Sequence, residues 1–148
     1  MQAWAYDENG WPSGFAGGKL LADEKNRDCY ILHSVGELDP NASVNYIIDT
    51  DELVRVSAGE ASAGREYLNL KIKTAVSTTD ILNPDVVDRF LNETHQKYKE
   101  NFGGNLGGGI CGFFTDEPQY QRWHIPYTHM LEGYFKEHYG EDVFDGLG

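Results

Sequence analysis

Apolar and aromatic positions divide the chain into a short first strand, a β-rich middle and a second half that alternates helix and strand. Residues 2–6 form an apolar, aromatic run that predicts a strand, and the turn residues 7–10 end it. Four glycines and one proline within 10–18 then predict an irregular loop, because glycine permits backbone angles closed to other residues.

The middle of the chain is rich in residues that favour strands. β-rich stretches cover 29–35, 44–49, 52–57 and 66–76, with turn residues between some of them. In the last stretch Leu68, Leu70 and Ile72 alternate with polar residues, which is typical of a strand with one face in water. We therefore expect residues 28–77 to form a small antiparallel sheet of three or four strands.

The second half predicts a helix, a strand and a second helix. Asn83-Pro84-Asp85 opens a helix over 84–101, since asparagine caps helix starts and proline suits the first turn. Residues 110–115 form an apolar run that predicts a buried strand. The last helix is expected near 127–139, with Gly140 as its end and Met130, Leu131, Tyr134 and Phe135 facing inward.

This order of elements predicts an α/β fold in a single domain over 1–148. An eight-stranded α/β barrel needs roughly 200 residues or more, so 148 residues cannot complete one. The expected fold class is a partial (β/α) barrel-like piece that carries the antiparallel sheet of 28–77 as an insertion.

The charge of the chain argues against some classes of binding partner. A net charge of −12 and a pI near 4.6 argue against nucleic acid or an anionic membrane as the main partner, because both would be repelled. Aromatic residues make up 13% of the chain, which suits both a packed core and carbohydrate binding. We expect Cys29 and Cys111 to be buried thiols.

The sequence shows no transmembrane segment and no signal peptide, and it leaves the cellular location open. A secreted or periplasmic parent is compatible with it.

Two pairs of acidic residues follow predicted strands. Asp116-Glu117 ends the strand at 110–115, and Asp7-Glu8 ends the first one. Substrates of α/β proteins bind at strand ends, where partial burial can raise the pKa of a carboxyl group toward that of a general acid. Glu117 is therefore the first catalytic candidate, although it could instead cap a helix or pair with Arg122. Solvated turn residues are an equally good interpretation of Asp7-Glu8.

Other residue types give weaker signals. Trp11 and Trp123 lie in predicted loops beside the acidic strand ends and could stack on a sugar, whereas Trp4 is expected in the core. His124 could contact a ligand, and His95 is expected at the helix surface or in helix packing. The histidine and cysteine spacing matches no zinc site. We expect no cofactor, although so acidic a chain would allow a calcium ion.

Four blocks of sequence together resemble a known family. They are Tyr6-Asp7-Glu8-Asn9-Gly10-Trp11-Pro12-Ser13-Gly14 with Ala16-Gly17-Gly18; Leu82-Asn83-Pro84 with Phe90, Thr94-His95 and Tyr98; Phe113-Phe114-Thr115-Asp116-Glu117-Pro118; and Tyr139-Gly140-Glu141-Asp142. In this order they are similar to bacterial glycoside hydrolases of the α-L-rhamnosidase type, family 106 and its uncharacterised relatives. That resemblance implies a barrel parent, longer than this chain, that hydrolyses glycosidic bonds.

The resemblance sets the functional expectation. It implies a glycoside hydrolase catalytic-domain fragment in which Glu117 is the acid or base, with Glu8 as the second catalytic candidate. Asp7, Trp11, Asp116, Trp123 and His124 would bind the carbohydrate. The isolated chain is expected to have negligible turnover. Two alternatives stay open: a non-catalytic carbohydrate-binding module, and a module that forms a homo-oligomer to cover open sheet edges.

Overall fold

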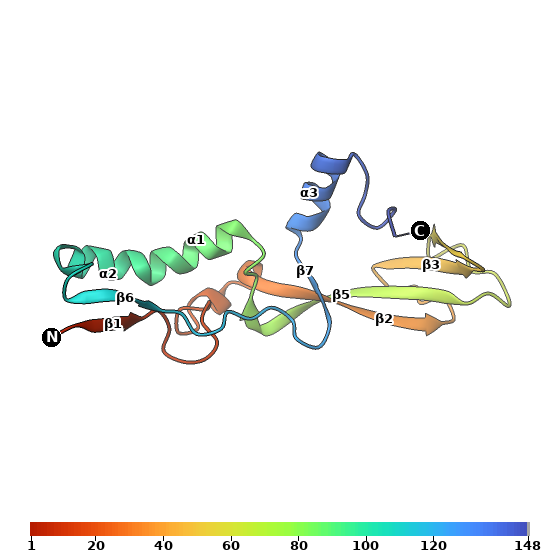
Figure 1. The fold of residues 1–148 in the computed structure, drawn as a ribbon. Coiled ribbons are helices and arrows are strands. Elements are labelled where there is room, and N and C mark those ends of the chain that lie inside the picture. The colour runs from red at the N-terminus through yellow and green to blue at the C-terminus, as the bar shows by residue number, and fades with distance from the viewer. Residues whose placement is uncertain (148) are drawn as a thin grey trace. The chain divides into compact units, whose positions relative to one another are not determined.

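The chain forms two compact units in the computed structural model, which describes residues 1–147 (Figure 1). Unit 1 comprises Met1–Asp28 and Thr74–Arg122, and unit 2 comprises Cys29–Lys73 and Trp123–Gly148. Two long strands, β2 (Arg27–Gly36) and β5 (Tyr67–Thr79), have residues in both units.

Unit 1 contains a two-stranded parallel sheet and two consecutive helices. Strand β1 (Ala3–Tyr6) pairs with β6 (Ile110–Phe114), so that Tyr6 lies opposite Phe114. Helices α1 (Pro84–Glu93) and α2 (His95–Phe102) run above these strands in Figure 1. Short 3₁₀ turns lie at Leu20–Ala22, Glu24–Asn26 and Gly103–Asn105.

The helix predicted over 84–101 is present, but it is interrupted. Its start follows the sequence signal, because the Asn83 side chain accepts a hydrogen bond from the Asp85 amide. At Thr94 the backbone leaves helical geometry, with φ −120° and ψ −81°, and α2 begins at the next residue. The Thr94 hydroxyl donates to the Phe90 carbonyl at 2.6 Å, which satisfies a carbonyl at the end of α1.

The helices of unit 1 pack by different contacts. Val86 and Phe90 of α1 are buried with Ala16 and Leu20 of the glycine-rich region. From α2, the Tyr98 ring meets the Phe113 ring of β6 edge-on at 5.4 Å. Successive strand residues face opposite sides, so Phe114 points away from α2 and is 54% exposed.

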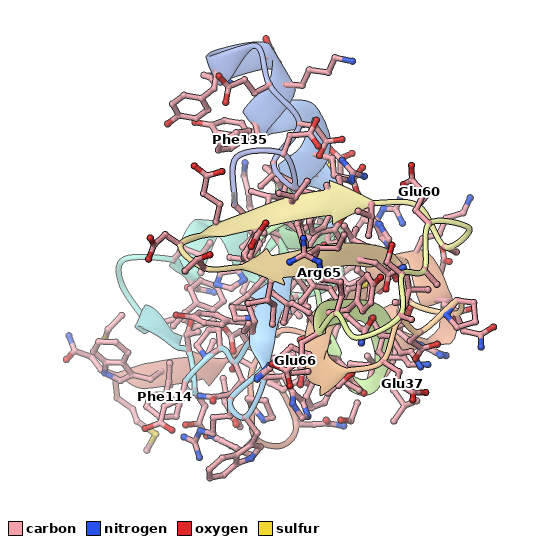
Figure 2. The ribbon with its side chains drawn as sticks, turned by 90° about the vertical axis from the view of Figure 1, so that its right-hand side faces the viewer. Glu37, Glu60, Arg65, Glu66, Phe114 and Phe135 are labelled. Carbon is pink, nitrogen blue, oxygen red and sulfur yellow. The ribbon has the colours of Figure 1, made fainter. Side chains whose placement is uncertain are left out.

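Unit 2 is built on an antiparallel sheet. The five-stranded sheet has the order β4-β3-β5-β2-β7, and it adds β3 (Val44–Asp49), β4 (Glu52–Val56) and β7 (Ile125–Tyr127) to the two long strands. Tyr46, Tyr127 and Phe144 lie in its core. Figure 2 looks onto one end of this sheet, where Glu37, Glu60, Arg65 and Glu66 project from the loops.

The expected barrel-like fold is wrong. A barrel piece would be a series of parallel strands joined by helices, whereas the largest sheet pairs β3 with β4, β3 with β5 and β2 with β7 in antiparallel fashion. Among the described strands β1 and β6 pair in parallel, with one isolated parallel bridge between Leu106 and Ile110. The region at 28–77 therefore supplies most of the main sheet and is not a small insertion in a barrel.

Three local expectations also need correction. The last helix, α3, covers Met130–Tyr139, because the residues before it enter β7. Met130 and Tyr134 are 48% and 57% exposed and do not face a core. Cys29 is buried as expected, but Cys111 is exposed.

Candidate functional site

Both acidic strand ends lie at one edge of the parallel sheet. Parallel strands bring their carboxyl ends to the same side, and the pairing of Tyr6 with Phe114 aligns the residues that follow. The Asp7 amide donates to the Phe114 carbonyl at 3.3 Å, and the Ser13 amide donates to the Asp116 carbonyl at 2.8 Å. The loop after β1 is thus tied directly to the loop after β6.

Asp7 is the buried centre of this junction. Its side chain has no exposed surface, and its two oxygens accept hydrogen bonds from the Ser13 hydroxyl at 2.7 Å and the Thr115 hydroxyl at 2.6 Å. The Ser13 oxygen in turn accepts from the Asp116 amide at 2.8 Å. A buried carboxylate needs such donors, so Asp7 holds the two loops together.

Glu8 is engaged within its own loop. Its carboxylate accepts hydrogen bonds from the amides of Asn9 at 3.0 Å, Phe15 at 3.1 Å and Gly17. The Phe15 and Gly17 donors belong to a loop in which Ala16, Gly17 and Gly18 have positive φ angles. Glu8 is only 7% exposed, and this arrangement makes it an anchor of the loop.

Glu117 is placed differently from the other three acids. Its side chain is exposed, and it accepts one hydrogen bond, from the Trp11 indole at 3.3 Å. Its φ angle of +41° is uncommon for a residue with a side chain, and such strain persists where the surroundings fix it. Trp11 is 52% exposed, and the Arg122 guanidinium lies 5.8 Å from the ring centre.

Asp116, which directly precedes Glu117, is partly buried. It accepts a hydrogen bond from the Tyr6 hydroxyl at 3.1 Å. Burial, together with the bond to Asp116, raises the pKa of the Tyr6 phenol, which keeps it protonated as a donor. We name Trp11, Asp116 and Glu117 the carboxylate rim.

A mostly apolar cavity of about 270 Å³ lies in unit 1, and none of the three rim residues is part of its lining. Its lining includes Gly14 and Thr115, which belong to the two joined loops, and Pro118, which follows Glu117. Helix α1 and the segment before it supply the apolar wall, which consists of Ile81, Val86, Val87, Phe90 and Leu91. Asp7 and His95 complete the lining.

His95 is a functional candidate that the sequence did not single out. Its ring lies 4.3 Å from the Phe113 ring, and its Nδ1 is 3.0 Å from the Thr94 hydroxyl. That hydroxyl already donates to the Phe90 carbonyl, so its oxygen must accept from Nδ1–H. The neutral ring therefore carries no proton on Nε2, which lies 3.9 Å from the buried Asp7 carboxylate.

Two predicted ligand-binding residues belong to unit 2. Trp123 is 85% exposed, and the His124 ring stacks on the Tyr30 ring at 4.6 Å. The other five predicted site residues, Asp7, Glu8, Trp11, Asp116 and Glu117, all lie in unit 1.

Sequence reasoning missed the contacts of Ser13 and Thr115 with Asp7, whereas the helix-packing role expected for His95 agrees with its ring contact to Phe113. The sequence does give an indication for Ser13 and Thr115. Thr115 directly precedes Asp116, and Ser13 lies in the loop that follows Asp7-Glu8. The contact of His95 depends on the break at Thr94, which the helical pattern did not show.

Further properties of residues 1–147 bear on the chemistry. Within that range no group of three or more His, Cys, Asp or Glu side chains is arranged to hold a metal ion. None of the helices described there has the length and apolar character needed to cross a membrane.

Comparisons with protein-family models, curated proteins and solved structures give no match to this chain.

Proposed function

We propose that the carboxylate rim binds a carbohydrate and that Glu117 transfers the proton when a glycosidic bond is hydrolysed. The observation that carries this proposal is the position of Glu117. It is an exposed carboxylate on a strained backbone beside a half-exposed indole, over a buried network that fixes both loops. Glycoside hydrolysis uses carboxylates that are held in fixed positions.

The chemical roles follow from the positions of the acids. Glu117, when protonated, would give its proton to the leaving oxygen as the bond to the sugar carbon breaks; when ionised, it would take a proton from water. Asp116 is the nearest other rim carboxylate in the sequence, and its bond to Tyr6 holds it. Glu8 is a weaker catalytic candidate because three backbone amides already occupy its carboxylate.

The test is turnover of a panel of aryl glycosides that includes rhamnosides and galactosides. For any glycoside that the wild-type chain turns over measurably, we expect Glu117→Gln to lower kcat by about 10²-fold or more, as loss of a general acid does. Glu100→Gln, which removes an exposed carboxylate on α2, is the matched control and should leave kcat unchanged. Turnover that is equal in the wild type and Glu117→Gln would remove Glu117 from this role.

A non-catalytic carbohydrate-binding module is the second candidate. The observation that favours it is the exposure of Glu117 and Trp11, since exposed aromatic and acidic side chains suit stacking and hydrogen bonding to sugar hydroxyls. Titration calorimetry with monosaccharides separates the two functions. Binding that survives Glu117→Gln, with no hydrolysis by the wild type, would favour the module.

A further inference from the structure

We infer that the carboxylate rim takes an acidic sugar, a uronic acid whose carboxylate binds the guanidinium of Arg122. This inference rests on the proposed function and names the class of substrate. It starts from the position of Arg122, whose guanidinium carbon lies 5.8 Å from the centre of the Trp11 ring. The Trp11 indole donates to Glu117, so an exposed cation and an exposed carboxylate lie beside one half-exposed ring.

Arg122 differs from the other arginines because its charge has no polar partner. Arg27 donates to a backbone carbonyl, and three others form ion pairs with aspartates, namely Arg55, Arg65 and Arg89. Within residues 1–147 the Arg122 guanidinium has neither an ion pair nor a hydrogen bond, so the pairing with Glu117 that the sequence allowed is not formed. In a chain of net charge −12, this leaves Arg122 available to a carboxylate from outside.

The segment that carries Arg122 is held at both ends. At its start, the Asp116 amide donates to the Ser13 hydroxyl at 2.8 Å. Directly before Arg122, the Gln121 side chain donates to both oxygens of the Asp28 carboxylate at 3.2 Å. All of these residues belong to unit 1. A segment with fixed ends loses less conformational freedom when it binds a ligand, so the guanidinium is partly preorganised.

A uronic acid fits this set of groups better than a neutral sugar. The planar guanidinium of arginine can donate two parallel hydrogen bonds to one carboxylate. A uronic acid carries its carboxylate directly on the sugar ring. A ring beside Trp11 can therefore bring the carboxylate to Arg122 while its glycosidic oxygen lies toward Glu117.

The negative charge of the chain does not exclude such a ligand. Exposed charges farther away than about 8 Å are largely screened at physiological ionic strength, so the groups nearest the ligand decide its binding. A uronate carries one charge, which Arg122 balances. A phosphate group would bring a second negative charge close to Asp116 and Glu117, which would repel it.

The experiment compares sugars that differ only at carbon 6. Methyl galacturonoside and methyl glucuronoside are titrated beside methyl galactoside and methyl glucoside, which have a hydroxymethyl group in place of the carboxylate. NMR follows the indole N–H of Trp11 in the intact chain. We expect each uronoside to bind about fivefold more tightly than its neutral partner at low salt, as a well-formed exposed ion pair allows. The ratio should approach one in about 0.5 M NaCl.

Charge variants assign this difference to Arg122. Arg122→Gln removes the guanidinium and should bring each uronoside to the affinity of its neutral partner, while the neutral sugars bind as before. Lys25→Gln is the matched control, because it removes one positive charge from another exposed residue of unit 1 and should leave the fivefold preference intact. Arg122→Lys keeps the charge without the planar fork and should retain a preference of only about twofold.

The outcomes separate this inference from the proposed function. Equal binding of uronosides and neutral glycosides, both detected at Trp11, would overturn the uronic acid assignment and leave the rim as a sugar site. A preference that survives Arg122→Gln would also overturn it, and so would tighter binding of methyl galactoside 6-sulfate than of methyl galacturonoside. If no sugar, neutral or acidic, shifts the Trp11 indole, both the uronic acid assignment and the proposed function fall.

Discussion

Replacing Ser13 with alanine should destabilise unit 1 far more than a hydroxyl deletion normally does. The hydroxyl is buried, donates to the Asp7 carboxylate at 2.7 Å, and accepts from the Asp116 amide at 2.8 Å. Ser13→Ala therefore removes a donor from a buried charge and an acceptor from a backbone amide with a single change. Asp7 would keep Thr115 as its hydrogen-bond donor.

The magnitude follows from these two bonds. A hydrogen bond to a charged group contributes about 1.5–3 kcal/mol, and leaving a partly buried amide unpaired costs about 1 kcal/mol at the lower end of its range. We expect a loss of about 3 kcal/mol in the free energy of unfolding. Small domains are stable by only about 5–15 kcal/mol, so this loss is easily measured.

The assay is urea unfolding followed by NMR at the backbone amides of 3–6 and 110–116, because these strands report on unit 1 alone. Ser77→Ala is the control, since Ser77 is an exposed serine in the same unit and its loss should change stability by no more than about 0.5 kcal/mol. A Ser13→Ala value within about 1 kcal/mol of this control would show that the Asp7 network does not hold the loops together.

Three further changes test other parts of the structure. Gly14→Ala should lower the free energy of unfolding of unit 1 by about 2 kcal/mol or more, because the φ of Gly14 is +133° and a methyl group is strained there; an unchanged urea midpoint would contradict that geometry. Tyr46→Phe should destabilise unit 2 by about 1–2 kcal/mol, since it leaves the Phe144 carbonyl without its buried donor, and an equal urea midpoint would refute this. The Phe144 amide and then Arg55 lower the pKa of Asp142, so Asp142 stabilises the folded state above the ordinary aspartate pKa of about 3.9 and this stabilisation is lost as the pH falls through the lowered folded value. The difference in urea midpoint between wild type and Asp142→Asn should accordingly shrink in acid, and a difference independent of pH would count against it.

The sequence predicted a strand or helix well where the pattern that marks it lies within that element. The strand at 44–49 is confirmed as β3, and the capped start of α1 is confirmed at Asn83. Alternation in a strand and caps in a helix depend on neighbouring residues, so a single sequence contains them.

Long-range pairing explains what the sequence did not show. Strand β7 has three residues, including Pro126, and it forms only because β2 offers an antiparallel partner about 100 residues earlier in the chain. No local pattern marks so short a strand, and the sequence places Tyr127 at the start of the last helix instead. The same dependence on pairing made the barrel assignment wrong. Residues 28–77 were expected to form an antiparallel insertion, but no local pattern showed that they form the main sheet or that β7 joins it.

The two Asp-Glu pairs show how neighbouring backbone donors decide the role of an acid. Both pairs follow parallel strands in register, yet Glu8 is buried and Glu117 is exposed. After Glu8 the chain supplies the amides of Asn9, Phe15 and Gly17, which donate to the carboxylate. After Glu117 comes Pro118, which has no amide hydrogen to donate, so this carboxylate is not captured by the next residue of its own loop. The backbone donors that follow each pair, more than the acids themselves, therefore separate a structural glutamate from one that remains accessible to a ligand.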